Sequence, residues 1–256
     1  VFGEVDSASL RHPLVLLLTC DEELGSLGAQ HLVSHWAGAA TLPRQIVIGE
    51  PTSLRVVRLH KGHLKLRITS RGIAAHSGTP QLGRTAVEPA AELIVALGAL
   101  SRALGDERRE TSPAFPETPS PALTVVRVRG GEAWNVVPDA CVIDLSIRTL
   151  PGDDGNDYID RVRSVVDDVA TRSGGDFEIV VIGDNPPLLG DRASRVSRWL
   201  LERVEQTDDP GVSYASDGGV LSRDLDRQCV LFGPGCMSVA HKPDEWISRA
   251  ELDRAG

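Results

Sequence analysis

The hydrophobic pattern of this chain changes twice, and the change limits the folds that the chain can adopt. Short continuous apolar runs lie near both ends, at Leu14–Thr19, Ile46–Ile48 and Cys229–Phe232. Such runs are typical of strands buried on both faces of a parallel sheet. From about Val57, apolar and polar residues instead alternate over longer stretches, as in half-exposed antiparallel strands. We therefore expect an α/β domain interrupted by a second, antiparallel domain.

The middle of the chain predicts the order β-α-β-β-α-β, which is the ferredoxin-like arrangement. The expected strands are Val57–Thr69, Ala122–Arg129, Val137–Arg148 and Phe177–Ile182, and the expected helices are Thr85–Leu104 and Asp157–Ser173. Outside this part, we expect helices at Gln30–Trp36 and Arg192–Gln206. The predicted fold is a mixed-sheet α/β domain, residues 1–56 and 184–256, with an inserted ferredoxin-like (α+β) domain at 57–183.

Composition excludes several classes of partner. The 27 Lys and Arg residues against 36 Asp and Glu residues give a net charge of −9, so a nucleic acid is not an expected partner. No apolar run approaches the roughly 18–20 residues that a membrane helix needs, so no membrane is expected either. Apart from Cys229 and Cys236, which six residues separate, the four cysteines lie far apart. They form no CxxC motif or dense disulfide framework, which favours a reducing cytoplasm.

Carboxylates follow two of the short apolar runs. Asp21, Glu22 and Glu23 come directly after the first run, and Glu50 follows the second. Ligands of open α/β sheets gather at the carboxyl ends of strands, so these acids are candidates for a site. Crowded negative charges repel one another unless a cation, a shared proton or a helix N-terminus compensates them. The alternative interpretation is that the acids cap a helix or are solvated.

Two histidines stand out beside these acids. His241 follows the glycine-rich turn that ends the last apolar run, and His76 lies among small residues that leave its ring accessible. His60 and His63 are interpreted as mostly structural. A lone loop histidine is rarely a ligand, but two carboxylates and an imidazole together suit zinc, cobalt or manganese. No Gly-x-Ser-x-Gly elbow is present, so a serine nucleophile is not expected.

Seven motifs, in order over nearly the whole chain, resemble those of the M20 metallopeptidase family. They are Leu18–Ala29 (LTCDEELGSLGA), Ile48–Leu54 (IGEPTSL), His60–Gly62 (HKG), Gly72–Gly78 (GxxxHSG), Asn135–Pro138 (NVVP), Ser146–Gly152 (SIRTLPG) and Gly233–Glu245 (GPGx4AHKPDE).

This resemblance implies a hydrolase with two zinc ions, with cobalt as a possible substitute. It implies that Glu22 is the general base and that Glu23 and His241 bind one ion. Glu50 matches a ligand of the other ion. Two metal ions would polarise an amide carbonyl and activate a water whose proton Glu22 takes.

The resemblance also implies residues that contact the substrate. His76 matches a histidine that reaches the active site of the partner subunit and stabilises the oxyanion, so we expect a homodimer formed through the inserted domain. Asn135 and Arg148 match positions that hold polar groups and the carboxylate of the substrate. Gly218 and Gly235 match loops that line the pocket.

The expected substrate is an N-acyl amino acid with a free carboxylate, because an arginine such as Arg148 favours bidentate carboxylate binding. N-Acetylornithine, a substrate of arginine biosynthesis, is the first candidate. N-Succinyl-diaminopimelate is the second, followed by acetylcitrulline, acetyl-lysine or another N-acyl amino acid.

One departure from the family pattern affects the metal site. The family has a His-x-Asp motif and a bridging aspartate well before the Glu-Glu pair, and neither lies in the residues that precede Glu22. We therefore expect a fragment or processed chain, with an incomplete set of metal ligands. The alternative is a non-catalytic M20-like module that dimerises or binds a ligand. The intact mass of the purified protein, compared with the upstream gene sequence, would show whether residues are missing.

Overall fold

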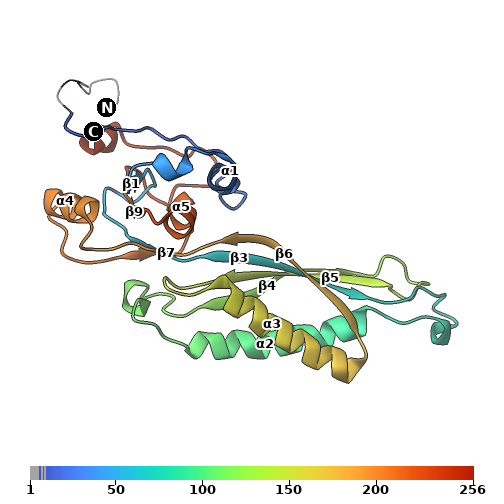
Figure 1. Ribbon diagram of the computed structural model, residues 1–256. Helices are drawn as coiled ribbons and strands as arrows, with labels where there is room; N and C mark the ends of the chain where they lie inside the picture. Colours follow the sequence, from blue (N-terminus) through green and yellow to red (C-terminus); the bar gives the residue numbers. More distant parts are fainter. Residues whose placement is uncertain (1–5, 7, 9) are drawn as a thin grey trace. The chain divides into compact units, whose positions relative to one another are not determined.

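The computed structural model describes residue 6, residue 8 and residues 10–256 (Figure 1). The chain divides into two compact units. The first unit combines the chain up to His60 with Leu188–Gly256, and the second unit is Lys61–Pro187. Each unit is described separately below.

The second unit is a four-stranded antiparallel sheet with two helices on one face (Figure 1). Its strands lie in the spatial order β4-β5-β3-β6 and every neighbouring pair is antiparallel. This order confirms the predicted ferredoxin-like arrangement. The elements are β3 (His63–Arg71), α2 (Val87–Asp106), β4 (Ala122–Gly130), β5 (Ala140–Arg148), α3 (Gly155–Ser173) and β6 (Asp176–Asn185).

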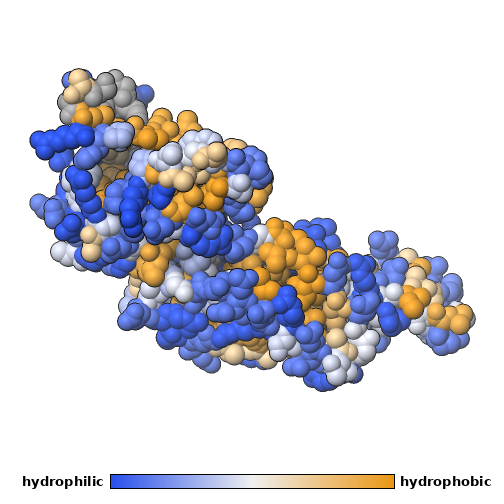
Figure 2. Space-filling view, viewed as in Figure 1, coloured by the Kyte–Doolittle hydropathy of each residue, from blue (hydrophilic) through white to orange (hydrophobic). Residues whose placement is uncertain are grey.

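Alternation along the strands places the core of this unit between the sheet and the helices. Leu64, Leu66 and Ile68 of β3 are fully buried, and they pack in one cluster with Leu93 of α2 and Val162 of α3. The intervening residues of β3 lie on the opposite, open face of the sheet. Hydrophobic side chains also reach the surface in the region of β6 (Figure 2).

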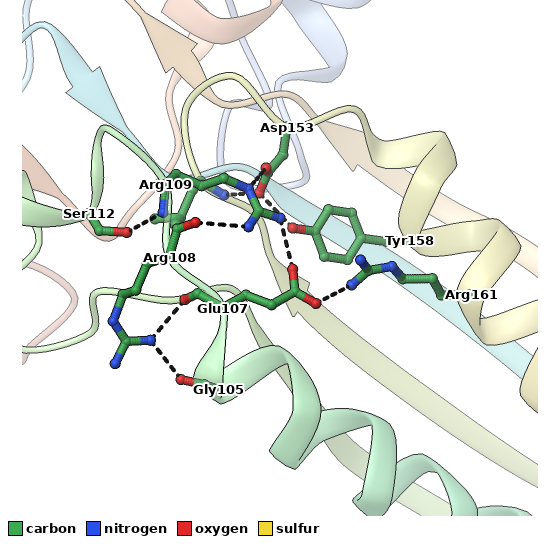
Figure 3. Close-up of polar contacts among 9 residues, drawn as sticks. Gly105, Glu107, Arg108, Arg109, Ser112, Asp153, Tyr158 and Arg161 are labelled. Carbon is green, nitrogen blue, oxygen red and sulfur yellow. Dashed lines mark hydrogen bonds and ion pairs between the residues drawn. The ribbon is translucent and has the colours of Figure 1, made fainter.

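A polar network joins the end of α2 to the first turn of α3 (Figure 3). Arg109 Nε donates to Asp153 Oδ1 at 2.7 Å, and the Tyr158 hydroxyl donates to Asp153 Oδ2 at 2.5 Å. Arg109 and Arg161 also donate to the two carboxylate oxygens of Glu107. The Asp153 side chain is only 7% exposed, so this network replaces the water that its carboxylate would otherwise bind.

The single strand predicted at Val57–Thr69 is wrong, because the chain leaves the strand at Lys61 and Gly62. The first part is β2 (Leu59–His60) and the second is β3. A Cβ at Gly62 would lie 2.3 Å from Thr149 Oγ1, so only glycine fits at this break. Lys61 is buried and donates through Nζ to the carbonyl oxygens of Thr118 and Ser120, at 2.6 and 2.9 Å.

The first unit contains two small sheets and several short helices. Strand β1 (Gln45–Ile48) pairs in parallel with β9 (Gln228–Leu231). Strand β2 pairs with β7 and β8 in a second, mixed sheet. The remaining elements are α1 (Leu27–His35), β7 (Leu188–Leu189), α4 (Arg195–Arg203), β8 (Gly211–Val212), α5 (Asp217–Leu225) and α6 (Arg249–Ala255).

The core of the first unit lies where α5 covers β9. Leu221 of α5, Cys229 and Leu231 of β9, and Leu188 of β7 are buried together. Helix α1 packs against α5. No helix in the described part of the chain is long and apolar enough to cross a membrane.

The buried strand predicted at Leu14–Thr19 is wrong. In the described structure this segment joins no sheet, and most of its hydrophobic side chains are exposed, with Leu18 at 82%. Leu17 is the member that packs against the buried cluster. The apolar run resembled a buried strand, but burial also requires a neighbouring strand, and β1 pairs only with β9 in the described residues.

Candidate active site

A tight turn after Thr19 presents Glu22 and Glu23 in the first unit. The backbone N–H groups of Gly25 and Ser26 both donate to the Glu22 carbonyl, at 2.9 and 2.8 Å. A Cβ at Gly28 would lie 2.2 Å from the Cys20 carbonyl oxygen, so only glycine lets α1 start this close to the preceding chain. Glu22 is partly buried as a result, whereas Glu23 is exposed.

Glu50 lies where β1 ends, next to the turn that follows β9. The two strands are parallel, so their carboxyl ends meet at the same edge of the sheet. The N–H groups of Ser53 and Leu54 donate to the carbonyls of Gly235 and Gly233, at 2.7 and 2.9 Å. A Cβ at Gly233 would lie 2.6 Å from the Glu50 carbonyl oxygen. The glycine-rich turn therefore supports the backbone that carries Glu50.

Glu23 and His241 come together although they lie near opposite ends of the chain. Glu23 Oε1 is 3.0 Å from His241 Nε2, and both side chains are exposed. His241 has a φ of 60°, in the left-handed region that non-glycine residues rarely adopt. An imidazole nitrogen and a carboxylate oxygen at this distance can share a proton or bind one cation.

The acids of this unit lie close enough to affect one another. The pKa of the Glu50 carboxyl is raised to about 7. Burial is the main cause, because a charged carboxylate loses hydration, and the negative charges of Glu22, Asp217 and Glu23 raise this pKa further. The structure therefore concentrates negative charge around Glu50.

Asp217, in the turn predicted to line the pocket, is a further member of this acidic cluster. It begins α5, is 6% exposed, and accepts a hydrogen bond at Oδ2 from Thr19 Oγ1 at 2.5 Å. Its Oδ1 is buried and has no hydrogen-bond partner among the described residues. In the sequence it resembles an ordinary acid in a helix first turn, so only the fold reveals its position.

The two glycines predicted to line the pocket lie in backbone turns of this unit. Gly218 is buried in the first turn of α5, and a Cβ there would lie 3.2 Å from Ser216 Oγ. Gly235 has a φ of 90°, and its N–H donates to Glu251 Oε2 at 2.8 Å.

A cavity of about 670 Å³ adjoins the acids. Glu22, Glu50 and Asp217 contribute to its wall, and the remaining wall is mainly apolar and comes from 13–19 and β1. A cavity with a few acids in an apolar wall is typical of small-molecule sites.

The donor set fits only part of a metal site. Glu23 and His241 supply one oxygen and one nitrogen ligand, whereas catalytic zinc sites generally take three ligands from protein. Across the described residues, no group of three or more His, Cys, Asp or Glu side chains is placed to hold an ion.

The remaining predicted residues lie in the ferredoxin-like unit. His76 is exposed on the segment after β3, and its Nδ1 accepts from the Gly78 N–H at 3.0 Å. This bond places the proton of the neutral ring on Nε2. The Ser77 N–H donates to the Asn135 carbonyl at 2.9 Å, so the structure brings the His76 and Asn135 segments together. Arg148 ends β5 and is partly buried.

Exposed hydrophobic side chains lie on the segments next to His76 and Asn135. Trp134, next to Asn135, has a relative exposure of 103%. Ile73, Leu82 and Val136 are also exposed. Val136 forms an isolated β-bridge with His76, so these side chains belong to the same end of the unit.

Comparison with known proteins agrees with this fold. Residues 58–173 match the family described as the M20 peptidase dimerisation domain. Solved structures with the same fold include aminopeptidase PepT from Bacillus cereus, with a TM-score of 0.66 at 20% identity, covering 93% of this chain and 60% of that one. An M20 family metallo-carboxypeptidase from Sulfolobus solfataricus has a TM-score of 0.62 at 20% identity, covering 91% and 66%. The chain therefore shares the fold of these two solved structures.

Sequence comparison extends the relationship to nearly the whole chain. Acetylornithine deacetylase from Vibrio parahaemolyticus is 33% identical over 252 residues, covering 98% of this chain and 64% of the relative. Acetylornithine deacetylase from Proteus mirabilis is 32% identical over 250 residues, covering 98% and 62%. This chain thus spans less than two thirds of the length of these relatives. Nearly the whole chain is thus similar to acetylornithine deacetylases, and residues 58–173 match the M20 peptidase dimerisation domain.

Proposed function

We propose that this chain acts as a metal-dependent amidohydrolase that removes the N-acyl group from an amino acid. The observation that supports this most directly is the contact between Glu23 and His241, close to the acids that raise the pKa of Glu50. The chain is also one third identical to acetylornithine deacetylases. The proposed metal is zinc, with cobalt as a substitute. Glu23 and His241 would bind one ion and Glu50 a second.

In the proposed reaction Glu22 is the general base. A bound metal would polarise the scissile carbonyl and lower the pKa of the attacking water. Glu22, partly buried at the cavity wall, would accept the proton of that water and pass it to the leaving amine. His76 would stabilise the oxyanion through its Nε2–H, because Gly78 already occupies Nδ1. One such donor contributes about 3–4 kcal/mol to transition-state stabilisation.

The proposed assembly is a homodimer in which His76 serves the active site of the partner subunit. Two observations support it: the match to a dimerisation domain, and the exposed hydrophobic side chains on the segments next to His76 and Asn135, with Trp134 wholly exposed. Contiguous exposed apolar groups of this kind often mark protein interfaces.

N-Acetylornithine is the proposed substrate, since it is the substrate named by relatives at 32–33% identity. Cytoplasmic arginine biosynthesis would then be the biological setting. N-Succinyl-diaminopimelate remains the alternative, because Arg148 and Asn135 would suit any acylated amino acid with a free carboxylate.

A non-catalytic role is the second candidate. It is favoured by the incomplete metal ligand set of the described residues. Such a module would keep the dimerisation fold and bind a ligand without hydrolysing it.

The test is hydrolysis by the purified natural gene product, loaded with zinc and assayed with N-acetylornithine and N-succinyl-diaminopimelate in parallel. We expect release of free ornithine and an activity loss in Glu23→Gln together with a loss of zinc. Ornithine release that does not depend on zinc would contradict the proposal, and zinc binding without hydrolysis of either substrate would favour the non-catalytic role.

A further inference from the structure

The open face of the ferredoxin-like sheet carries basic residues whose surroundings differ between its two ends. At one end the basic side chains are paired with acids. Arg67 Nε and Arg127 Nε donate to the two oxygens of the buried Asp144, at 2.7 and 2.5 Å. Arg71 forms an ion pair with Glu178. Three basic side chains thus share two carboxylates, so every one of them has an acidic partner and one net positive charge remains there.

At the other end, Lys65 and Arg148 have no acidic partner among the described residues. Lys65 pairs with Ser146 in the β3–β5 register, and Arg148 lies two residues beyond Ser146 on the same face. His63 lies two residues before Lys65 on the same face of β3, and its Nε2 is 2.9 Å from Ser146 Oγ. Arg148 is partly buried, and that burial lowers the pKa of its guanidinium. A partly buried cation without a counter-charge is costly for a fold to keep.

The groups that face His63 are positive or neutral. Burial, together with the positive charges of Arg148 and Lys65, lowers the pKa of His63 to about 4, so the ring is neutral at pH 7. On β6, Asn185 is the register partner of His63. Asp184 pairs with Leu64, whose side chain is in the core, and Asp184 Oδ1 lies 3.1 Å from a Cβ built at Gly155. Asp184 therefore points to the helix face and not to His63.

We propose that Lys65, His63 and Arg148 form an anion-binding subsite that takes a carboxylate group. The guanidinium of Arg148 matches a carboxylate with two parallel N–H donors, and Lys65 adds a second positive charge without a fixed direction. The bond to Ser146 orients the imidazole of His63. Carboxylate binding was proposed above for Arg148, and the subsite adds His63 and Lys65 to it. Only the identity of the natural carboxylate rests on the proposed function.

A bound carboxylate would change the titration of His63. A negative charge beside the ring opposes the two positive charges that keep it neutral, so the pKa of His63 should rise when the subsite is filled. By linkage, carboxylate affinity should increase as the pH falls toward that higher value. The resonance of His63 is therefore a local probe of occupancy.

The experiment is an NMR pH titration of the His63 Cε1–H in the natural gene product, with and without acetate, and with His63→Gln to assign the signal. We expect acetate to raise the pKa by at least one unit, which means at least tenfold tighter acetate binding to the protonated form. Arg148→Gln should raise the pKa without acetate and abolish the acetate effect. Arg71→Gln, a basic residue already paired with Glu178, should change neither result.

Lys65→Gln provides a second variant if Arg148→Gln does not fold. It should weaken acetate binding at least fivefold, and raise KM for N-acetylornithine while leaving kcat within twofold. The subsite would be overturned if acetate did not raise the pKa of His63 in the wild type. It would also be overturned if acetate raised this pKa equally in the wild type and in both variants. If inorganic phosphate raised the pKa of His63 and acetate did not, the assignment to a carboxylate would be wrong. Acetate binding without hydrolysis would instead overturn the proposed function and leave the subsite intact.

Discussion

His241 Nε2 lies 3.0 Å from Glu23 Oε1, so the structure joins an acid near the start of the chain to a histidine near its end. The turn after β9 and the turn before α1 make this contact possible, and neither side chain is buried. In the proposed enzyme this pair would bind one metal ion, while Glu22, the neighbour of Glu23, would take the proton of the attacking water.

Glu22→Gln should reduce turnover by about 10²–10⁴-fold, because an amide cannot accept the proton of the water. Zinc content should remain close to that of the wild type, since Glu22 is not a proposed ligand. Steady-state assays of N-acetylornithine hydrolysis and plasma mass spectrometry measure the two effects. A variant with more than a tenth of the wild-type kcat would contradict the assignment of Glu22 as base.

The polypeptide of residues 1–256 alone should bind zinc weakly, because its described residues hold no group of three metal ligands. After dialysis against metal-free buffer we expect far less than one zinc per chain and no deacylase activity. Plasma mass spectrometry measures the metal. Near-stoichiometric zinc that survives dialysis would show that the ligand set is complete within these residues.

Mixed dimers should test whether His76 acts in the partner subunit. Glu22→Gln and His76→Ala subunits, each inactive alone, should regain activity when refolded together, because one active site of the mixed dimer would contain both intact groups. Native mass spectrometry would verify that mixed dimers form. Mixed dimers that form and stay inactive would contradict the role of His76 across the interface.

His63 should make stability depend on pH below neutrality. Its folded-state pKa of about 4 lies below the ordinary value of 6.5, so between these values the unfolded chain binds more protons. Stability therefore rises with pH across this window and is lost as the pH falls through it, by up to about 3 kcal/mol. Urea denaturation of wild type and His63→Gln at pH 4.5 and 7.5 measures the difference. We expect a smaller pH effect in the variant, and equal effects would contradict the prediction.

Asp153→Asn should destabilise the ferredoxin-like unit by about 2–4 kcal/mol. The amide would remove one of the two negative charges that pair with the partly buried Arg109, leaving only Glu107, and could not accept all the bonds that Asp153 now accepts. Asp154→Asn is the matched control. Asp154 caps α3 by accepting from the Asn156 N–H at 2.9 Å, and asparagine caps equally well, so its effect should stay within about 0.5 kcal/mol. Equal losses in both variants, measured by urea denaturation, would show that the network contributes nothing specific.

The sequence by itself determined the elements of the ferredoxin-like unit and their order. Helices α2 and α3 and strands β4, β5 and β6 lie within a few residues of the predicted ranges. The reason is that one face of each element is buried, and the period of a buried face is written into consecutive residues. Glu22, Glu23 and Glu50 could also be predicted as site candidates, because each of them closely follows a short apolar run in the sequence.

Only the tertiary structure decided which segments find partners. The run at Leu14–Leu18 has the composition of a buried strand, but no strand lies beside it among the described residues. The predicted strand at Val57–Thr69 is interrupted at Gly62, where Thr149, far along the chain, occupies the space that a Cβ would need. The pairing of Glu23 with His241 and the burial of Asp217 Oδ1 likewise depend on residues that are distant in the sequence. Periodicity records which face of an element is buried. It carries no information about what lies against that face, because burial energy depends on area and not on the identity of the neighbour.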